Sequence, residues 1–304
     1  MLDATSLGAC LYVPATHPDL PRIAHGDKLA HLRSLIFCTE DAVNEADVPL
    51  ALSNIEKALL DLKRSERRHL FIRVRSPHIL DLVLQMPGAD RIDGFVLPKV
   101  SHHNFSSYMD KLRATGHAVM PTLETREAFN EHDMSRLLAL MDRTDVHERI
   151  CCLRIGGNDL LSLIGMRRPR GRTIYQTPIG TVISKLVTTF RPYGFSLSAP
   201  VFEYLDDIAT LDCEVEEDLY HGLVGKTAIY PNQVSQIESH YSVRSADLEA
   251  AQQILAENSA AVFRFQDAMC EPATHRNWAN AILKSARIYG CRGTVSELEQ
   301  QVVE

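Results

Sequence analysis

Eight short apolar runs recur along the first 230 residues of the chain, and a stretch with helical spacing of apolar residues follows most of them. Most runs are nearly continuous in Val, Ile, Leu, Phe, Cys and Ala, as expected for parallel strands that are buried on both faces. This recurrence predicts repeated βα units around a parallel sheet. The runs are Ala9–Ala15, Ser34–Asp41, His69–Arg75, Gly94–Val100, Ala118–Glu124, Arg149–Gly157, Gly194–Val201 and Leu223–Tyr230.

The number of units favours a closed barrel. Eight βα units in roughly 230 residues approach the ~250 residues of a (β/α)8 barrel, whose active site lies at the C-terminal ends of the strands. A doubly wound open sheet is the alternative, but no GxGxxG motif follows the first run. We therefore predict an α/β fold, a (β/α)8 TIM barrel over residues 1–240.

The pattern changes after His240. Ala246–Phe265 and His275–Ile288 carry apolar residues at helical spacing, and Pro272 disfavours a continuous helix between them. We predict that residues 241–304 form a C-terminal helical extension without strands, which packs on the barrel or on a neighbouring subunit.

Composition excludes several classes of function. The net charge of −7 argues against general binding to nucleic acid or to an anionic membrane. No apolar run approaches the ~20 residues of a membrane span, and the N-terminus lacks a signal-peptide pattern. Seven cysteines without CxxC spacing are typical of core thiols in a reducing compartment. We expect a cytoplasmic protein.

Two acids at neighbouring strand ends suggest a metal site. Glu124 ends the fifth run, and Asp159 follows the sixth. Mg²⁺ takes hard oxygen ligands, commonly one or two carboxylates together with water and substrate. We predict that these two residues bind Mg²⁺. The alternative is that each acid caps the helix beginning beside it, near Thr125 and at Leu160.

Other ionisable residues stand at the same strand ends. Of Arg73 and Arg75, we expect one to point into the barrel, where a guanidinium holds a substrate carboxylate or stabilises an enolate; a structural ion pair is the alternative. Glu40 and Asp41 are expected to face opposite sides, and either is a candidate acid beside the site. Lys99 can balance charge there or form a salt bridge towards the helices.

Four arginines crowd the segment GMRRPRGR after Asp159. They are Arg167, Arg168, Arg170 and Arg172. A basic loop over a barrel mouth can bind the phosphates of coenzyme A or of another phosphorylated substrate. A solvated basic loop is the alternative.

Seven motifs, in their order along the chain, resemble those of a superfamily of Mg²⁺-dependent carbon–carbon lyases. This superfamily contains citrate lyase beta-subunits, malyl-CoA lyases and 2-keto-acid aldolases. LYVPATHPD, FCTEDAV, IRVR, GFVLPKV, PTLET, RIGGNDLL and GLVGKTAIYPNQV are similar to successive motifs of that barrel. QTPIGTVISKLV and LSAPVFEYLDD most resemble the branch associated with bacterial tellurite-resistance and stress gene clusters.

The resemblance implies a mechanism and an assembly. Glu124 and Asp159 would ligate Mg²⁺ and Arg73 would contact the substrate, while the metal stabilises an enolate during retro-aldol or retro-Claisen cleavage. A homo-oligomer, either a trimer or a hexamer, is also implied. Two positions depart from the pattern: Tyr230 replaces the histidine of the IHP-type motif, and SAPVFE lacks an expected aspartate. A phenol titrates far above an imidazole, so acid–base steps assigned to those groups do not transfer.

The leading hypothesis is a Mg²⁺-dependent lyase acting on a small carboxylated or acyl-CoA substrate, with Arg73, Asp41, Glu40 and Lys99 as catalytic candidates. The two departures motivate an alternative, a catalytically altered barrel that serves as a binding or assembly subunit of a stress-related biosynthetic complex. Phosphoryl chemistry on a phosphorylated keto acid would instead require the arginine segment to lie close to Glu124 and Asp159.

Overall fold

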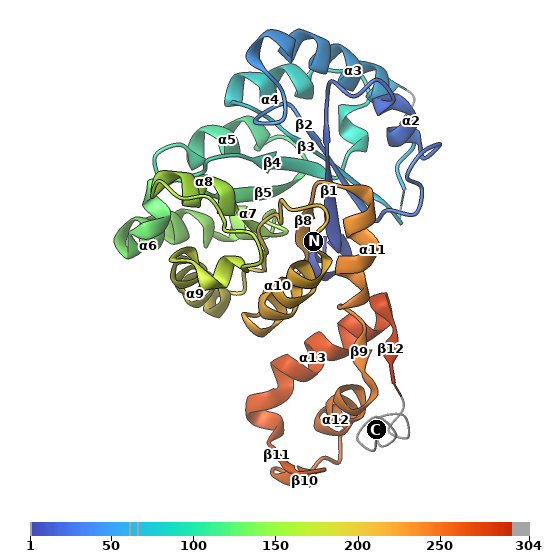
Figure 1. The fold of residues 1–304 in the computed structure, drawn as a ribbon, viewed down its shortest axis with the longest axis vertical. Coiled ribbons are helices and arrows are strands. Elements are labelled where there is room, and N and C mark those ends of the chain that lie inside the picture. Colours follow the sequence, from blue (N-terminus) through green and yellow to red (C-terminus); the bar gives the residue numbers. More distant parts are fainter. Residues whose placement is uncertain (1, 61, 66, 294–304) are drawn as a thin grey trace. The chain divides into compact units, whose positions relative to one another are not determined.

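In the computed structural model, eight parallel strands form one sheet in the order β7-β6-β5-β4-β3-β2-β1-β8 (Figure 1). A bridge between Ala199 and Lys226 joins the segment after β7 to β8 and closes the sheet. The predicted (β/α)8 barrel is confirmed, and each predicted run contains one strand. The strands are β1 (Ala9–Pro14), β2 (Ser34–Cys38), β3 (His69–Arg73), β4 (Gly94–Leu97), β5 (Ala118–Leu123), β6 (Leu153–Ile155), β7 (Leu197–Ser198) and β8 (Lys226–Ala228).

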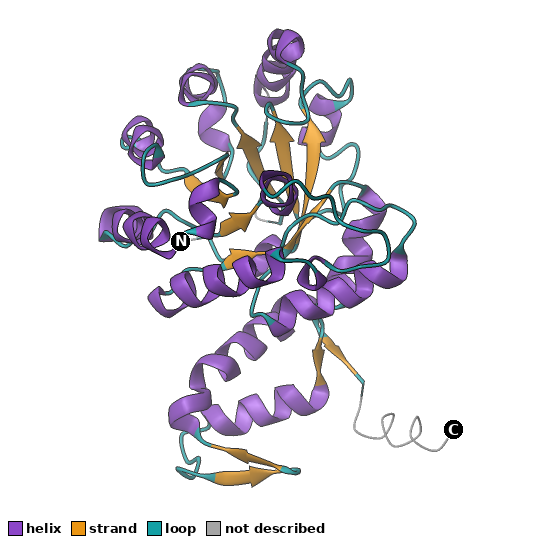
Figure 2. Ribbon diagram, turned by 60° about the vertical axis from the view of Figure 1, so that its left-hand side comes forward, coloured by secondary structure: helices purple, strands orange, loops and turns teal. Residues whose placement is uncertain are grey.

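Helices follow the strands and surround the barrel (Figure 2). In α9 the buried residues recur at intervals of one to four positions along one side, so an amphipathic helix covers the sheet. No helix in the described part of the chain is long and apolar enough to cross a membrane. The helices are α1 (Ala4–Leu7), α2 (Leu20–His25), α3 (Val48–Leu60), α4 (Pro77–Leu84), α5 (Phe105–Leu112), α6 (Glu131–Met141), α7 (Thr144–His147), α8 (Gly157–Leu163), α9 (Ile179–Phe190), α10 (Ile208–Tyr220) and α11 (Pro231–Ser239).

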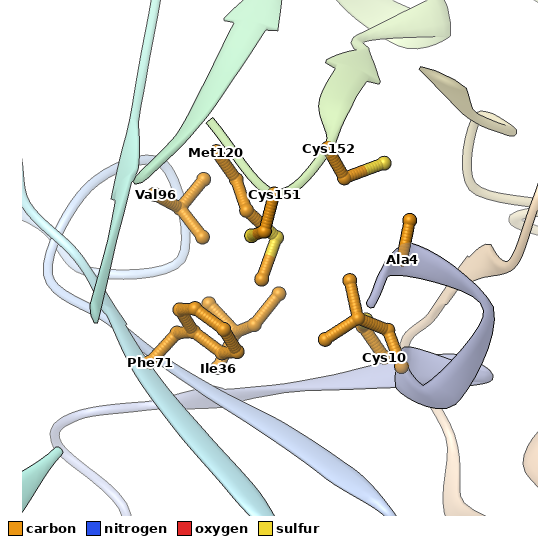
Figure 3. Close-up of a cluster of buried hydrophobic side chains, with 9 residues drawn as sticks. Ala4, Cys10, Ile36, Phe71, Val96, Met120, Cys151 and Cys152 are labelled. Atoms are coloured by element: carbon orange, nitrogen blue, oxygen red, sulfur yellow. The ribbon is translucent and has the colours of Figure 1, made fainter. Parts of the chain in front are cut away.

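The barrel interior changes character along its axis. Its N-terminal part is apolar, and the cluster drawn in Figure 3 includes Cys10, Ile36, Phe71, Val96, Met120 and Cys152 from six consecutive strands and their ends. Two residues further along four of these segments stand Tyr12, Arg73, Thr122 and Arg154. Side chains two residues apart on a strand share a face, so the interior becomes polar towards the C-terminal ends of the strands.

The structure describes residues 2–60, 62–65 and 67–293, and the chain divides into two compact units between Ser235 and Gln236. After α11, the second unit contains β9 (Val243–Arg244), α12 (Ser245–Leu255), β10 (Phe263–Phe265), β11 (Ala268–Cys270), α13 (Pro272–Tyr289) and β12 (Cys291–Arg292). β10 and β11 are antiparallel, and β9 pairs with β12.

The expectation of a tail without strands was wrong. The first helix ends at Leu255 rather than Phe265, because Phe263 and Phe265 alternate as strand residues and pack against a small cluster of Ala251, Ile254, Cys270 and Ala279. Residues 294–304 of the predicted extension lie outside the described residues. The packing of this tail on the barrel or on a neighbouring subunit stays a prediction.

Candidate active site

Arg73 ends β3 and lies among three carboxylates at the mouth of the barrel. Its Nη2 atom is 2.8 Å from Glu40 Oε2, 3.2 Å from Asp41 Oδ2 and 3.0 Å from Glu124 Oε1. Arg75 lies beyond the strand, and its guanidinium donates to the carbonyl oxygens of Thr39 and Glu40. Residues two apart on a strand share a face, so it is the end of β3 at Arg73, and not strand alternation, that separates the two arginines.

Glu40 and Asp41 meet the same cations, so the expectation that they face opposite sides was wrong. β2 ends at Cys38, and side chains alternate only within the extended strand. The Lys99 ammonium donates to Glu40 and to Asp41, where the Nζ–Oδ1 distance is 3.1 Å. The Asp41 amide also donates to Glu40 Oε2 at 2.7 Å, which ties the two acids together.

Lys99 connects the acids of the mouth through both its backbone and its side chain. Its φ of +50° is a left-handed conformation that is uncommon for a side-chain-bearing residue. Its amide donates to Glu124 Oε1 at 2.9 Å, and its Nζ lies 3.7 Å from Asp159 Oδ1. Burial lowers the pKa of Lys99, but Glu40 and Asp41 outweigh that effect and raise it above its ordinary value. The lysine therefore faces the mouth rather than the outer helices.

Glu124 is the most deeply buried acid of the mouth, with 3% of the residue exposed. Burial, together with the nearby Asp159 charge, raises the pKa of Glu124 to about 7, although Arg73 opposes the shift. Gly156 makes room for it, because a Cβ there would lie 2.1 Å from Glu124 Oε2. The Glu124 carboxylate bonds to Arg73 and Lys99, not to the amides of the next helix, which disfavours the capping alternative.

Asp159 occupies the first turn of α8, at the mouth beside Glu124. Its side chain is 33% exposed, so it can meet a ligand. A carboxylate in the first turn also interacts favourably with the helix dipole, and this is compatible with ligand binding.

The charge balance of the mouth fits a divalent cation. Four carboxylates surround two cations, which leaves a formal charge of −2 when all are ionised; the residues are Glu40, Asp41, Glu124, Asp159, Arg73 and Lys99. Within the described ranges, no group of three or more His, Cys, Asp or Glu side chains is placed to hold a metal ion. Two protein carboxylates completed by water and substrate is a usual arrangement for Mg²⁺.

The four arginines of the basic segment have different roles in the structure. Arg168 is buried and pairs with Glu214 at 2.8 Å, so it is not free to bind a phosphate. The guanidinium carbons of Arg167 and Arg170 lie 5.9 Å and 5.1 Å from the centre of the Tyr204 ring. Arg167, Arg170 and Arg172 are exposed and remain available.

The two positions that depart from the family pattern lie differently. Tyr230 follows β8 and is 50% exposed. In the SAPVFE segment, Val201 accepts a hydrogen bond from Arg168 through its carbonyl oxygen, and Glu203 Oε2 lies 3.3 Å from Arg168 Nε. That segment therefore anchors the basic loop.

Three interior residues beside the mouth were not singled out from the sequence: Tyr12, Thr122 and Arg154. The Tyr12 ring lies between two guanidiniums, with its centre 5.8 Å from the Arg73 Cζ and 5.4 Å from the Arg154 Cζ. Thr122 and Arg154 are register partners on β5 and β6. The sequence did contain a signal for them. Each is a polar residue in an otherwise apolar strand, an even number of positions from residues that face the barrel interior.

Residues 1–291 match the sequence profile of the carbon–carbon bond lyase family of the TIM-barrel fold. The chain therefore belongs to this family of lyases, as the ordered motifs indicated. No curated protein matches the sequence significantly.

Solved structures show the same fold. A citrate lyase from Burkholderia xenovorans LB400 superposes with a TM-score of 0.73 at 17% identity, covering 97% of this chain and 96% of that one. CitE from Mycobacterium tuberculosis, in complex with magnesium, acetoacetate and coenzyme A, gives 0.69 at 20% identity, covering 93% and 99%. RipC from Yersinia pestis gives 0.63 at 18% identity, covering 81% and 100%.

Proposed function

We propose that the protein is a Mg²⁺-dependent lyase that cleaves, or in reverse forms, a carbon–carbon bond in a small carboxylated substrate through an enolate. The excess negative charge of the mouth carries this proposal. Glu124 and Asp159 supply two carboxylates at neighbouring strand ends, while only Arg73 and Lys99 balance the four acids there. A divalent cation removes this imbalance.

The residues of the mouth then divide the work. Glu124 and Asp159 would hold the metal, and a bound Mg²⁺ would supply Lewis-acid chemistry at a substrate oxygen. Arg73 binds the substrate carboxylate, for which a planar guanidinium is well matched. Glu40 and Asp41 hold Arg73 and Lys99 in position, and the Lys99 charge favours negative charge that develops on the substrate.

A coenzyme A thioester is a compatible form of the substrate. Arg167, Arg170 and Arg172 are exposed on the basic segment and suit its phosphates. The M. tuberculosis relative was crystallised with coenzyme A and acetoacetate, and related structures of that protein hold oxaloacetate or pyruvate. The proposal also includes a homo-oligomer, a trimer or hexamer, in the cytoplasm.

Calorimetric titration of Mg²⁺ in the presence of pyruvate tests the proposal. Wild type should bind the metal, whereas Glu124→Gln and Asp159→Asn should each weaken binding at least about tenfold, because each loses a charged oxygen ligand. Arg149→Met is the matched control, since Arg149 hydrogen-bonds to the carbonyl oxygens of Leu112 and His117 and not to a residue of the mouth. Far-UV circular dichroism checks the fold of each variant.

Turnover of candidate keto acids and acyl-CoA thioesters completes the test. A Mg²⁺-dependent product that Glu124→Gln abolishes supports the lyase. Absence of metal binding in folded wild type would contradict it and favour the binding or assembly subunit.

A further inference from the structure

Arg154 differs from every other buried cation in the described part of the chain. Four lysine or arginine residues are at most 9% exposed there: Arg73, Arg154, Arg168 and Lys226. Arg73 has three carboxylate partners, Arg168 has Glu203 and Glu214, and Lys226 has Glu214 and Asp218. Among the described residues, no carboxylate lies within ion-pair distance of Arg154, although it is only 2% exposed.

The partners that Arg154 does have are neutral. Its Nη2 donates to Thr227 Oγ1 at 2.5 Å, its Nη1 lies 3.6 Å from Met120 Sδ, and its guanidinium stands over the Tyr12 ring. A charge removed from water without an ionic partner is costly, so buried charges in proteins are normally paired. The protein leaves this cation without the counter-ion that it gives the other three.

The position of Arg154 identifies what can supply that counter-ion. It contacts the same Tyr12 ring as Arg73. It is also the register partner of Thr122 on β5, a strand that ends at Leu123, one residue before Glu124. Arg154 therefore lies one layer deeper in the barrel than the candidate metal pair. Thr122 beside it is 4% exposed, and its buried hydroxyl has no hydrogen-bond partner in the described structure.

We propose that Arg154 binds a second carboxylate of the substrate, with the Thr122 hydroxyl as an additional donor, so that the enzyme selects small keto diacids over keto monoacids. The proposal rests on the proposed function, in which Arg73 binds the first carboxylate of the substrate. The planar guanidinium presents two parallel donors, the arrangement that binds a carboxylate bidentately.

Two ligands of matched chain length test this selection. Oxaloacetate carries a carboxylate where 2-oxobutyrate carries a methyl group, so the ratio of their dissociation constants isolates the second charge. In the presence of Mg²⁺, freshly dissolved oxaloacetate should bind wild type at least about tenfold more tightly, because a charge-assisted hydrogen bond is involved. The ratio should fall to near one in Arg154→Met and should persist in the control Arg149→Met.

Two further readouts separate binding from a purely structural role. Arg154→Met removes an uncompensated charge, so the ligand-free variant should be at least as stable to urea as wild type. Lower stability with an unchanged ratio would assign Arg154 a structural role and overturn the inference. Arg154→Lys keeps the positive charge but loses the planar guanidinium, so it should lower the ratio of dissociation constants several-fold. This variant provides the test if Arg154→Met does not fold.

Two contrary results have different meanings for the selection of diacids and for the proposed function. Equal binding of both ligands to wild type overturns the selection of diacids while leaving the lyase in place. Absence of Mg²⁺-dependent binding of either ligand overturns the proposed function and this inference together.

Discussion

Two networks of charged side chains lie on opposite sides of the barrel wall, one at the mouth and one under α10. In the network under α10, Lys226 Nζ is 2.9 Å from Glu214 Oε1 and 2.8 Å from Asp218 Oδ2, and Arg168 pairs with the same glutamate. Glu214 and Asp218 meet two cations there, and all four residues are buried. Glu203, whose side chain is 15% exposed, adds a third acid at the edge, with Oε2 3.3 Å from Arg168 Nε. At the mouth, four acids meet two cations, and the Asp41, Lys99 and Asp159 side chains are 54%, 44% and 33% exposed.

The difference separates structure from chemistry. The buried part of the network under α10 pairs two acids with two cations and needs no ligand, so its role is to hold the basic segment, α10 and β8 together. The mouth is incomplete in charge and open to solvent, which is what a ligand-binding site requires. The GKTAIY motif illustrates this difference. Lys226 belongs to the network under α10, whereas the next residue, Thr227, contacts Arg154 inside the barrel.

The largest effect on stability is expected in the network under α10. Glu214→Ala leaves Lys226 and Arg168 short of negative charge in a buried site and should lower the free energy of unfolding by about 3–5 kcal/mol. Urea denaturation at neutral pH measures this change. A loss below about 1 kcal/mol would mean that the network does not depend on its central acid.

The same network should make stability depend on pH. Burial, helped by Glu214 and opposed by Lys226, raises the pKa of Asp218 from 3.8 to about 6. Between these values the folded chain binds a proton that the unfolded chain has released. The contribution of Asp218 therefore favours folding below pH 3.8 and is lost as pH rises to about 6.

Asp218→Asn removes this titration. The unfolding free energy of wild type relative to the variant should therefore fall, by an amount on the order of 1–3 kcal/mol, between pH 4 and pH 7. Urea denaturation across this range gives both curves. Parallel curves would show that Asp218 does not titrate there.

At the mouth, a comparable substitution should cost little stability. The pKa of Glu124 is about 7, so its carboxylate is already partly protonated at neutral pH, and a glutamine oxygen can still accept from Arg73 and Lys99. In metal-free buffer, Glu124→Gln should change the free energy of unfolding by no more than about 1 kcal/mol. A loss as large as that of Glu214→Ala would remove the distinction between the two networks.

The smallest effect is expected on the exposed part of the basic segment. Arg172→Ala should change stability by less than about 0.5 kcal/mol, as surface substitutions usually do. Arg168→Ala in the same segment should resemble Glu214→Ala, because it leaves Glu214 with one cation. Thermal unfolding of Arg172→Ala and Arg168→Ala compares the two positions. Similar losses of stability in both variants would contradict the different roles assigned to these arginines.

The barrel could be predicted from the sequence because each apolar run reflects a local property, the burial of both faces of a strand. It was less successful where a boundary mattered. Glu40 and Asp41 were placed on opposite sides because the strand was taken to continue to Asp41, whereas it ends at Cys38. Phe263 and Phe265 were assigned to a helix because their two-residue period is short.

The candidate site shows the same division. The placement of Glu124, Asp159 and Arg73 at one mouth follows from parallel strands whose C-terminal ends share one side. The burial of Arg168 does not follow from its position among three exposed arginines, because its partner Glu214 is 46 residues away. Arg154 likewise acquires its meaning only from the absence of an acid around it in the described structure.

The amino-acid sequence by itself determined the βα repeat, the membership of a carbon–carbon lyase family and the acids at the strand ends, because these depend on local pattern and chain order. The tertiary structure decided which charges are neutralised. That outcome depends on contacts between residues far apart along the chain, such as Arg73 with Glu124, 51 positions apart, and Arg168 with Glu214, 46 positions apart. Electrostatic pairing is set by distance and burial, and neither can be read from spacing along the chain.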